Sequence, residues 1–235
     1  MLYKRILLKI SGEKLASKDG EVFDYDFIGR LVEKLANIQK QGVQIVLVVG
    51  AGNIFRARKG LKYNIPQVAG DTIGMVSILV NALCVAEVAR SLGVQCSVYS
   101  SLFVPQIAPL FTRKDALDSL ERNEIVVLAG GTSQPFFTTD STAALRALEL
   151  DCEVVLKATK VEGVYDKDPT LYSDAKKFDD LNYDEVLERR LNVMDMSAFA
   201  LCRDYKLPIR VFSLENLDNL ENVLNDTKIG TLIHN

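Results

Sequence analysis

The residue types best suited to chemistry gather in one loop, residues 130–140, which holds two glycines, a proline, four hydroxyl side chains and an aspartate. The apolar residues 125–129 before it are typical of a buried strand. Residues 141–150 predict a helix, with Thr139, Asp140 or Ser141 as its N-cap. Free backbone N–H groups and the helix dipole would favour an anion there. The alternative is an ordinary capped loop of an α/β protein.

Histidine and cysteine usage excludes several kinds of active site. The only histidine is His234, next to the C-terminus. A Ser-His-Asp triad, a Cys-His pair or a histidine metal site is therefore excluded, unless the tail folds back. The four cysteines are far apart and form no C-x-x-C pair, which favours buried thiols in a reducing compartment over disulfides or zinc. They are Cys84, Cys96, Cys152 and Cys202.

Composition limits the partners of this chain. It has 235 residues, 48% of them hydrophobic, which is enough for one large core or two coupled lobes. A net charge of −3, 8% aromatic residues and no tryptophan argue against a nucleic-acid partner. The N-terminus runs straight into a strand, and we expect no stretch that is long and apolar enough to span a bilayer. We therefore expect a cytoplasmic protein with no membrane partner.

Apolar patterning predicts an α/β fold. Apolar runs predict strands at 4–10, 43–49, 94–99, 125–129, 154–158, 209–212 and 231–233. Helical spacing predicts helices at 26–41, 71–92, 113–122, 141–150, 184–190, 197–205 and 217–224. This alternation predicts a mostly parallel central sheet sandwiched by helices. No repeat or linker divides the chain, so we expect one domain over residues 1–235.

The carboxyl ends of the predicted strands carry further candidates, because ligands bind beyond such ends in an open α/β sheet. The relevant stretches are 9–12, 50–53, 130–140 and 157–168. Lys9, inside an apolar strand end, is costly to bury unless it meets an anion; the alternative is a lysine that reaches solvent. Arg56, Arg58 and Lys59 form a basic trio, for which a solvated face is the alternative to a ligand site.

The familiar nucleotide motifs are missing or incomplete. No glycine is followed by lysine, so there is no Walker A loop. The pair Gly50-x-Gly52 lacks a third glycine, although Asp71 lies at about the distance of a ribose-binding acid, so a Rossmann-type NAD-dependent oxidoreductase stays open. Two aspartates, Asp140 and Asp168, without a histidine base favour phosphoryl transfer, which depends on positioning and charge stabilisation. A phosphate acceptor, with a second pKa near ~6, would need no base.

Several segments, in order along almost the whole chain, resemble the signature segments of bacterial uridylate kinases (UMP kinases) of the amino acid kinase family. These segments are 9–13 (KISGE), 49–56 (VGAGNIFR), 70–75 (GDTIGM), 131–140 (GTSQPFFTTD), 156–165 (LKATKVEGVY), 193–195 (VMD) and 206–212 (KLPIRVF). The resemblance implies the amino acid kinase fold and transfer of the γ-phosphoryl group of ATP to UMP with Mg²⁺. It also implies a homohexamer under allosteric control by nucleotides.

The resemblance assigns roles position by position, with an acceptor-binding part at about 1–150 and an ATP-binding part at about 151–235. Lys9 and Asp140 would be catalytic, with Asp195 in the same region, and no metal ligand is assigned. ATP would meet Lys9, Ile10, Ser11, Gly12, Gly52, Arg56, Thr159, Tyr165 and Asp168. UMP would meet Ala51, Asp71, Thr132, Ser133, Gln134, Pro135, Phe136, Phe137, Thr138 and Thr139.

The chain departs from the family pattern at three places. The family usually has glycine where Ala51 stands, and the added methyl group narrows the approach of the backbone to a phosphate. Ser133-Gln134 replaces a common Gly-Asn, and residues 17–24 lack the glycine-rich form that accompanies GTP activation in many relatives. The allosteric effector is therefore left open. A uridine nucleotide sensor without catalysis is the binding-module alternative, although Lys9 and Asp140 are both present.

Overall fold

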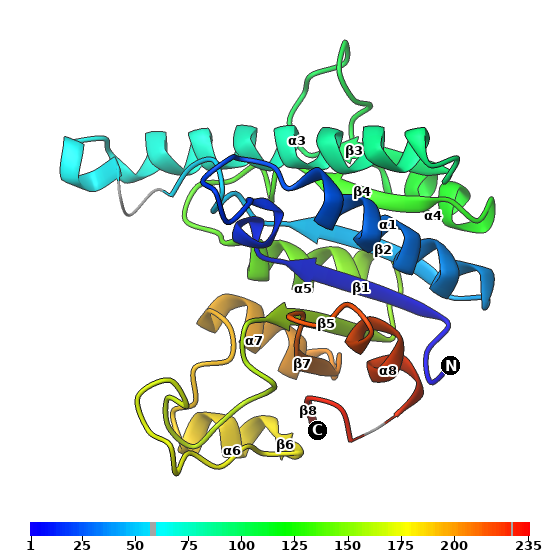
Figure 1. Cartoon of the computed structure of the whole chain (residues 1–235). Coiled ribbons are helices and arrows are strands. Elements are labelled where there is room, and N and C mark those ends of the chain that lie inside the picture. The colour runs from blue at the N-terminus through cyan, green and yellow to red at the C-terminus, as the bar shows by residue number, and fades with distance from the viewer. Residues whose placement is uncertain (57–59, 227) are drawn as a thin grey trace.

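The computed structural model describes residues 1–56, 60–226 and 228–235. Within these ranges, eight strands form a single sheet in the order β3-β4-β2-β1-β5-β7-β8-β6 (Figure 1). The strands are β1 (Arg5–Ile10), β2 (Gln44–Val49), β3 (Cys96–Ser100), β4 (Ile125–Ala129), β5 (Val154–Thr159), β6 (Asp180–Asn182), β7 (Ile209–Ser213) and β8 (Thr231–His234). Neighbouring strands are parallel except for the antiparallel pair β7–β8. The predicted fold class is confirmed.

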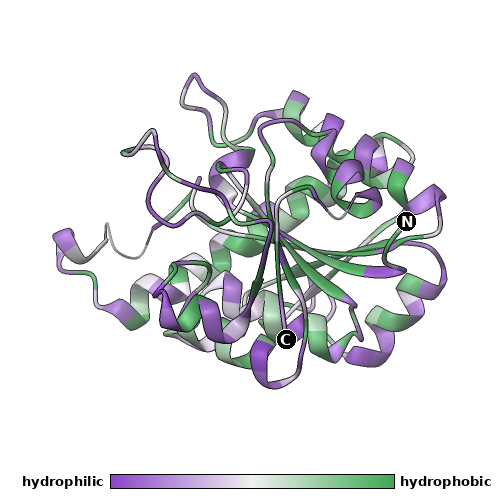
Figure 2. Ribbon diagram, turned by 90° about the horizontal axis from the view of Figure 1, so that it is seen from below, coloured by the Kyte–Doolittle hydropathy of each residue, from purple (hydrophilic) through white to green (hydrophobic). Residues whose placement is uncertain are grey.

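Helices cover both faces of the sheet. They are α1 (Tyr25–Lys40), α3 (Gln67–Ser91), α4 (Arg113–Glu121), α5 (Thr139–Glu149), α6 (Tyr183–Glu188), α7 (Met196–Asp204) and α8 (Asn219–Asn225), with short 3₁₀ helices η1 (Gly12–Leu15) and η2 (Leu61–Tyr63). Residues of α1, α3 and α8 form one hydrophobic cluster with the sheet, and residues of α4 to α7 form the other. Figure 2 shows the hydrophobic strands between these layers, with hydrophilic residues on the outer sides of the helices.

Strand β1 shows how this arrangement positions the first candidate residue. Ile6, Leu8 and Ile10 belong to the cluster with α1, whereas Leu7 belongs to the cluster with α5. Successive side chains of a strand point to opposite faces, so Lys9 shares the face of Leu7. The local sequence therefore directs the Lys9 side chain toward α5.

The structure corrects the expected starts of two helices. Thr138 is the N-cap of α5, and its side chain accepts hydrogen bonds from the backbone N–H groups of Asp140 and Ser141 at 3.0 and 3.3 Å. The predicted caps Thr139, Asp140 and Ser141 lie inside the first turn. Helix α3 begins at Gln67 after Pro66, four residues before the predicted start, because a proline suits the position before a helix and ends the preceding loop.

We expected no stretch that is long and apolar enough to span a membrane, but one helix is, judged by its length and composition alone. Among the described residues, α3 alone meets that description: its most apolar 18-residue window has a mean hydropathy of 1.9. Half of this window is buried inside the protein, where α3 packs against α1, β3 and β4. A core helix of a soluble protein has the same properties.

Candidate active site

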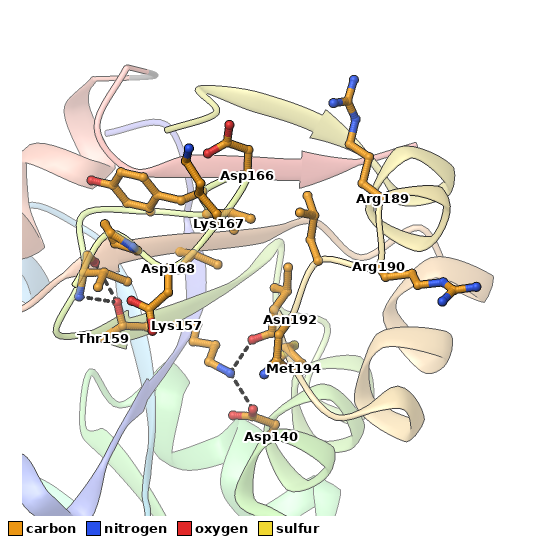
Figure 3. Close-up of a pocket in the computed structure, with 18 of the residues that line it drawn as sticks. Asp140, Lys157, Thr159, Asp166, Lys167, Asp168, Arg189, Arg190, Asn192 and Met194 are labelled. Atoms are coloured by element: carbon orange, nitrogen blue, oxygen red, sulfur yellow. Dashed lines mark hydrogen bonds and ion pairs between the residues drawn. The ribbon is translucent and has the colours of Figure 1, made fainter. Parts of the chain in front are cut away.

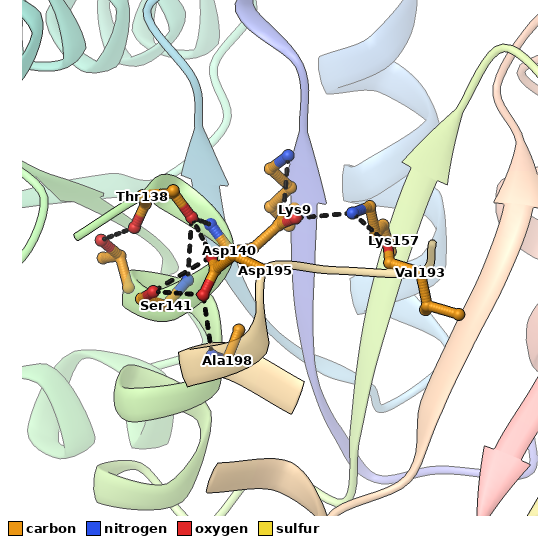
Figure 4. Close-up of polar contacts among 9 residues, drawn as sticks. Lys9, Thr138, Asp140, Ser141, Lys157, Val193, Asp195 and Ala198 are labelled. Atoms are coloured by element: carbon orange, nitrogen blue, oxygen red, sulfur yellow. Dashed lines mark hydrogen bonds and ion pairs between the residues drawn. The ribbon is translucent and has the colours of Figure 1, made fainter. Parts of the chain in front are cut away.

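Two lysines on neighbouring strands face one carboxylate. Strands β1 and β5 are parallel, and Lys9 lies directly opposite Lys157 in their register. Asp140, in the first turn of α5, lies between them, with Oδ1 2.8 Å from Lys9 Nζ and Oδ2 2.6 Å from Lys157 Nζ (Figure 4). The three side chains are only 12–14% exposed. The site thus contains a largely buried cluster with two positive charges and one negative charge.

The electrostatics of this cluster favour the ionised carboxylate. Burial alone raises the pKa of Asp140, but the charges of Lys9 and Lys157 outweigh it, so this pKa lies below its ordinary value. Burial and the neighbouring charge of Lys9 hold the pKa of Lys157 below its ordinary value, against the opposing effect of Asp140. Asp140 Oδ1 lies 2.8 Å from Lys9 Nζ and has no other hydrogen-bond donor among the described residues. The cluster therefore carries excess positive charge and an under-used carboxylate oxygen.

A second carboxylate fixes the segment beside the cluster. Asp195 is the N-cap of α7 and accepts the backbone N–H of Ala198 at 2.9 Å. It also accepts hydrogen bonds from the hydroxyls of Thr138 and Ser141 at the start of α5. Lys157 Nζ donates to the carbonyl of Val193 at 2.5 Å. These bonds hold the 193–195 segment against the start of α5 and against Lys157 of β5 (Figure 4). Asp195 therefore lies beside Asp140, in the region where the resemblance placed it.

A cavity of about 720 Å³ opens on the β5 side of the cluster (Figure 3). We call it the donor cavity, because its lining includes three residues that the resemblance assigns to ATP. Its lining includes Lys157 and five residues to which the resemblance gives a role, namely Asp140, Thr159, Tyr165, Asp168 and Asp195. The backbone N–H and hydroxyl of Thr170 donate to Asp168 Oδ1 at 2.8 and 2.6 Å, and these bonds hold the pKa of Asp168 below its ordinary value. Asp168 is therefore an ionised, locally oriented carboxylate at this cavity.

A second cavity, of about 460 Å³, lies on the β2 side, and we call it the acceptor cavity. The predicted residues that line it are Ala51, Gly52, Arg56, Asp71, Phe137, Thr138 and Thr139. Thr138 and Thr139 line this cavity, whereas the next residue, Asp140, lines the donor cavity. The linings of the two cavities therefore meet at the start of α5, where Asp140 and Lys157 of the cluster line the donor cavity and Lys9 lines neither.

Asp71 connects α3 to residues 130–138, the loop between β4 and α5, which we call the acceptor loop. Because α3 starts at Gln67, Asp71 lies in the second turn of the helix and is not its N-cap. Its Oδ2 accepts the backbone N–H of Phe136 at 2.9 Å, and its Oδ1 accepts Gln67 Nε2 at 2.7 Å. This carboxylate therefore orders the acceptor loop at the wall of the acceptor cavity.

Other predicted residues lie near the site without lining either cavity. Thr132, Ser133, Gln134, Pro135 and Phe136 form the tip of the acceptor loop, and Phe136 is 72% exposed. The Thr132 hydroxyl donates to the carbonyl of Gln134 and accepts a hydrogen bond from the backbone N–H of Gln134, both at 3.2 Å. This hydroxyl therefore stabilises the loop itself. The structure does not place these five residues against the cavity wall.

Residues 10–12, which the resemblance assigns to ATP, line neither the donor nor the acceptor cavity. Ile10 is fully buried in the core, and neither Ser11 nor Gly12 lines a cavity. A side chain at Gly12 would place its Cβ 2.3 Å from the carbonyl oxygen of Gly50, so only glycine allows the two turns after β1 and β2 to pack together. Of the basic trio, Arg58 and Lys59 lie outside the described residues.

Sequence reasoning singled out the stretches that contain Lys157 and Glu13 but gave these two residues no role, and it missed Gln67. Lys157 carries the same signal as Lys9, a lysine within an apolar strand end, but their partnership depends on β1 and β5 being neighbours. Glu13 is the last residue of the recognised segment 9–13, and it lines the acceptor cavity. Nothing in its local sequence marks Gln67. His234 stays with Asp180, 3.1 Å from its carboxylate, so the tail does not fold back to the cluster.

Comparison with known proteins places this geometry in a family. The sequence model described as the Amino acid kinase family matches residues 4–213. The chain belongs to the amino acid kinase family. Within this family it is similar to the uridylate kinase of Xanthomonas campestris pv. campestris, with 44% identity over 231 residues, covering 98% of this chain and 96% of the relative. It is also similar to the uridylate kinase of Bacteroides thetaiotaomicron, with 40% identity over 99% of each chain.

Solved amino acid kinase structures support the same assignment. The UMP kinase from Bacillus anthracis superposes with a TM-score of 0.95 at 33% identity, over 100% of this chain and 97% of the other. The UMP kinase from Ureaplasma parvum gives a TM-score of 0.94 at 28% identity over both complete chains. These similarities confirm the resemblance drawn from the sequence, and they do not favour an oxidoreductase or a sensor without catalysis.

Proposed function

We propose that this protein is a UMP kinase, which transfers the γ-phosphoryl group of ATP to UMP and yields ADP and UDP. The observation that carries the proposal is the Lys9–Asp140–Lys157 cluster, which lies where two nucleotide-sized cavities adjoin. Its excess positive charge suits a phosphoryl group in transfer, which needs positioning and charge stabilisation. The similarity to uridylate kinases over nearly the whole chain supports UMP as the acceptor.

Each residue of the cluster has a distinct task in this mechanism. Lys9 and Lys157 approach the transferred phosphoryl group from adjacent strands and stabilise the negative charge that spreads over its oxygens. Asp140 holds both ammonium groups in place and keeps them from repelling each other. Because UMP presents a phosphate oxygen that is already ionised above its second pKa of ~6, no residue needs to act as a general base.

The two cavities divide the substrates between them. ATP occupies the donor cavity, with Thr159, Tyr165 and Asp168 beside its base and ribose, and its phosphates extend toward residues 9–12, Gly52 and Arg56. UMP occupies the acceptor cavity, where Ala51, Asp71 and the 132–139 loop surround it. On this proposal residues of about 1–150 serve the acceptor, and residues of about 151–235 serve ATP, within one domain.

The site fits a Mg²⁺ ion that arrives with ATP. No group of three or more metal-binding side chains occurs within residues 1–56, 60–226 and 228–235. Magnesium in such sites is held by one or two carboxylates together with substrate phosphates, and it neutralises phosphate charge. Asp140, with its under-used Oδ1, is the residue of this chain that would share in holding it.

Helix α3 suggests how copies of this chain assemble. Ile73, Val76 and Val80 follow one another at helical spacing and are 41–48% exposed, an apolar stripe of the kind that contacts another subunit. We infer a homohexamer in which this stripe is covered, with allosteric control by a nucleotide. The protein would act in the cytoplasm, in pyrimidine nucleotide biosynthesis. Light scattering on a size-exclusion column tests the hexamer, and a monomer at micromolar concentration would contradict it.

A coupled ADP-release assay across UMP, CMP, AMP and GMP tests the proposed function. We expect rapid turnover with UMP and little with the other three acceptors. Binding of UMP without any ADP release would instead identify a nucleotide sensor. Equal turnover with all four acceptors would show that the acceptor cavity does not select uracil.

A further inference from the structure

Glu13 joins cations from the two sides of the site. It lies in η1, directly after Gly12, and lines the acceptor cavity. Its Oε1 pairs with the guanidinium of Arg56, which lines the same cavity. Its Oε2 lies 3.5 Å from Nζ of Lys160, which sits between two residues that line the donor cavity, Thr159 and Val161. One carboxylate therefore spans the junction between the cavities.

The Glu13 side chain also lies against Gly52. A methyl group at residue 52 would place its carbon 3.1 Å from Glu13 Cγ and 3.3 Å from Glu13 Oε1. The resemblance to uridylate kinases assigns Gly52 and Arg56 to the ATP phosphates. The Glu13 carboxylate thus lies beside the Gly52 backbone and the Arg56 guanidinium, in the space where a phosphate group bound to them would lie. Arginine binds carboxylate and phosphate through the same planar set of donors, so the two anions compete for it.

We propose that Glu13 is a positioning residue that takes the place of a phosphate group while the site lacks nucleotide. Its carboxylate keeps Arg56 and Lys160 close together, one from each side of the site, and releases them to the incoming phosphate. The inference rests on the proposed phosphate-binding role of Arg56, and it goes beyond the roles assigned to the catalytic cluster. On this proposal Glu13 lowers the affinity of the site for phosphate, because it competes for Arg56 and Lys160. It also keeps these two side chains in position before phosphate binds.

The test is the isosteric variant Glu13→Gln, which keeps the shape of the side chain and removes its charge. Because exposed ion pairs are weak and Arg56 is 44% exposed, we expect the variant to bind ATP and pyrophosphate about two- to fivefold more tightly, measured by titration calorimetry. The KM for ATP should fall by a similar factor without a rise in kcat. A purely structural role for Glu13 predicts the opposite sign, weaker binding together with a lower melting temperature.

Glu215→Gln is the matched control. Glu215 pairs with Lys14, the neighbour of Glu13, but lines neither the donor nor the acceptor cavity. It removes the same charge from the same region, so any general electrostatic effect appears in both variants. Equal or weaker binding of ATP and pyrophosphate by Glu13→Gln, or an equal gain in Glu215→Gln, would overturn the inference. Absence of UMP-dependent ADP release by the native protein would instead refute the proposed function, while the pyrophosphate titration still tests Glu13.

Discussion

The substitution Asp140→Asn tests the cluster most directly. It leaves the helix cap intact, because Thr138 caps α5. It removes the charge that separates Lys9 from Lys157, two side chains only 12% and 14% exposed. Removing one partner of a buried ion pair costs roughly 3–5 kcal/mol, and we expect the lower end because Lys157 can lose its proton. For a chain of this size a loss of about 3 kcal/mol lowers Tm by roughly 6–12 °C.

The same substitution should lower kcat, because the two lysines lose the group that fixes them at the transferred phosphoryl group. Loss of one preorganised electrostatic contact costs roughly 10²–10³-fold in kcat. Thermal unfolding with and without ATP, followed by the coupled ADP-release assay, measures both effects. We expect ATP to restore part of the lost Tm, because its phosphates supply the missing negative charge.

The control for this experiment is Asp26→Asn. Asp26 is also an aspartate in the first turn of a helix, α1, but it is exposed. It should leave Tm within about 2 °C and kcat unchanged, as surface substitutions do. If Asp140→Asn behaved like Asp26→Asn in both measurements, the cluster would have neither the structural nor the catalytic role argued from its geometry.

Three further predictions concern the same site. Lys9→Met should lower kcat by roughly 10²–10³-fold while the protein stays folded by circular dichroism; near-normal kcat would make Lys9 a structural residue. Asp71→Asn should reduce the preference for UMP over dUMP, which we expect to be about one to two decades in kcat/KM, and leave the KM for ATP unchanged; equal use of UMP and dUMP by the native enzyme would remove Asp71 from ribose recognition. Because the folded-state pKa of Asp140 lies below its ordinary 3.8, its contribution to stability is present above that pH and is lost as pH falls further. The difference in unfolding free energy between the native protein and Asp140→Asn should therefore shrink below about pH 3.8, and a constant difference down to pH 2 would contradict this.

Much of the architecture can be predicted from short stretches of the sequence. The continuous apolar run of β1 predicts a strand buried on both faces, and the two-residue periodicity then assigns Lys9 to the face of Leu7. Strand β6 escaped prediction because its three residues include Asp180 and Asn182, which lack any apolar pattern. The N-cap of α5 is Thr138 and none of the three predicted residues, because several neighbouring side chains are equally good caps by type.

The contacts within the candidate site, in contrast, cannot all be predicted from short stretches of the sequence. Strand ends at 9–12, 50–53, 130–140 and 157–168 do converge, as the parallel sheet requires. The pairing of Lys9 with Lys157, however, depends on strand order, and nothing in either segment states which strand lies beside which. The position of Glu13 between Arg56 and Lys160 depends on three segments at once. Such contacts follow from the assembled fold and not from any one motif.

The register between β1 and β5 also has a mechanical consequence. On the proposed division of the chain, β1 lies in the acceptor-binding part and β5 in the ATP-binding part, and the two strands are neighbours in one sheet. A hinge that opened the two parts would have to break the pairing of these strands in the middle of the sheet. The distance between the backbones of Lys9 and Lys157 is therefore fixed by the pairing of β1 with β5. We therefore expect any opening of the site to involve the loops beside the two cavities, residues 131–138 and 160–170, and not a hinge within the sheet.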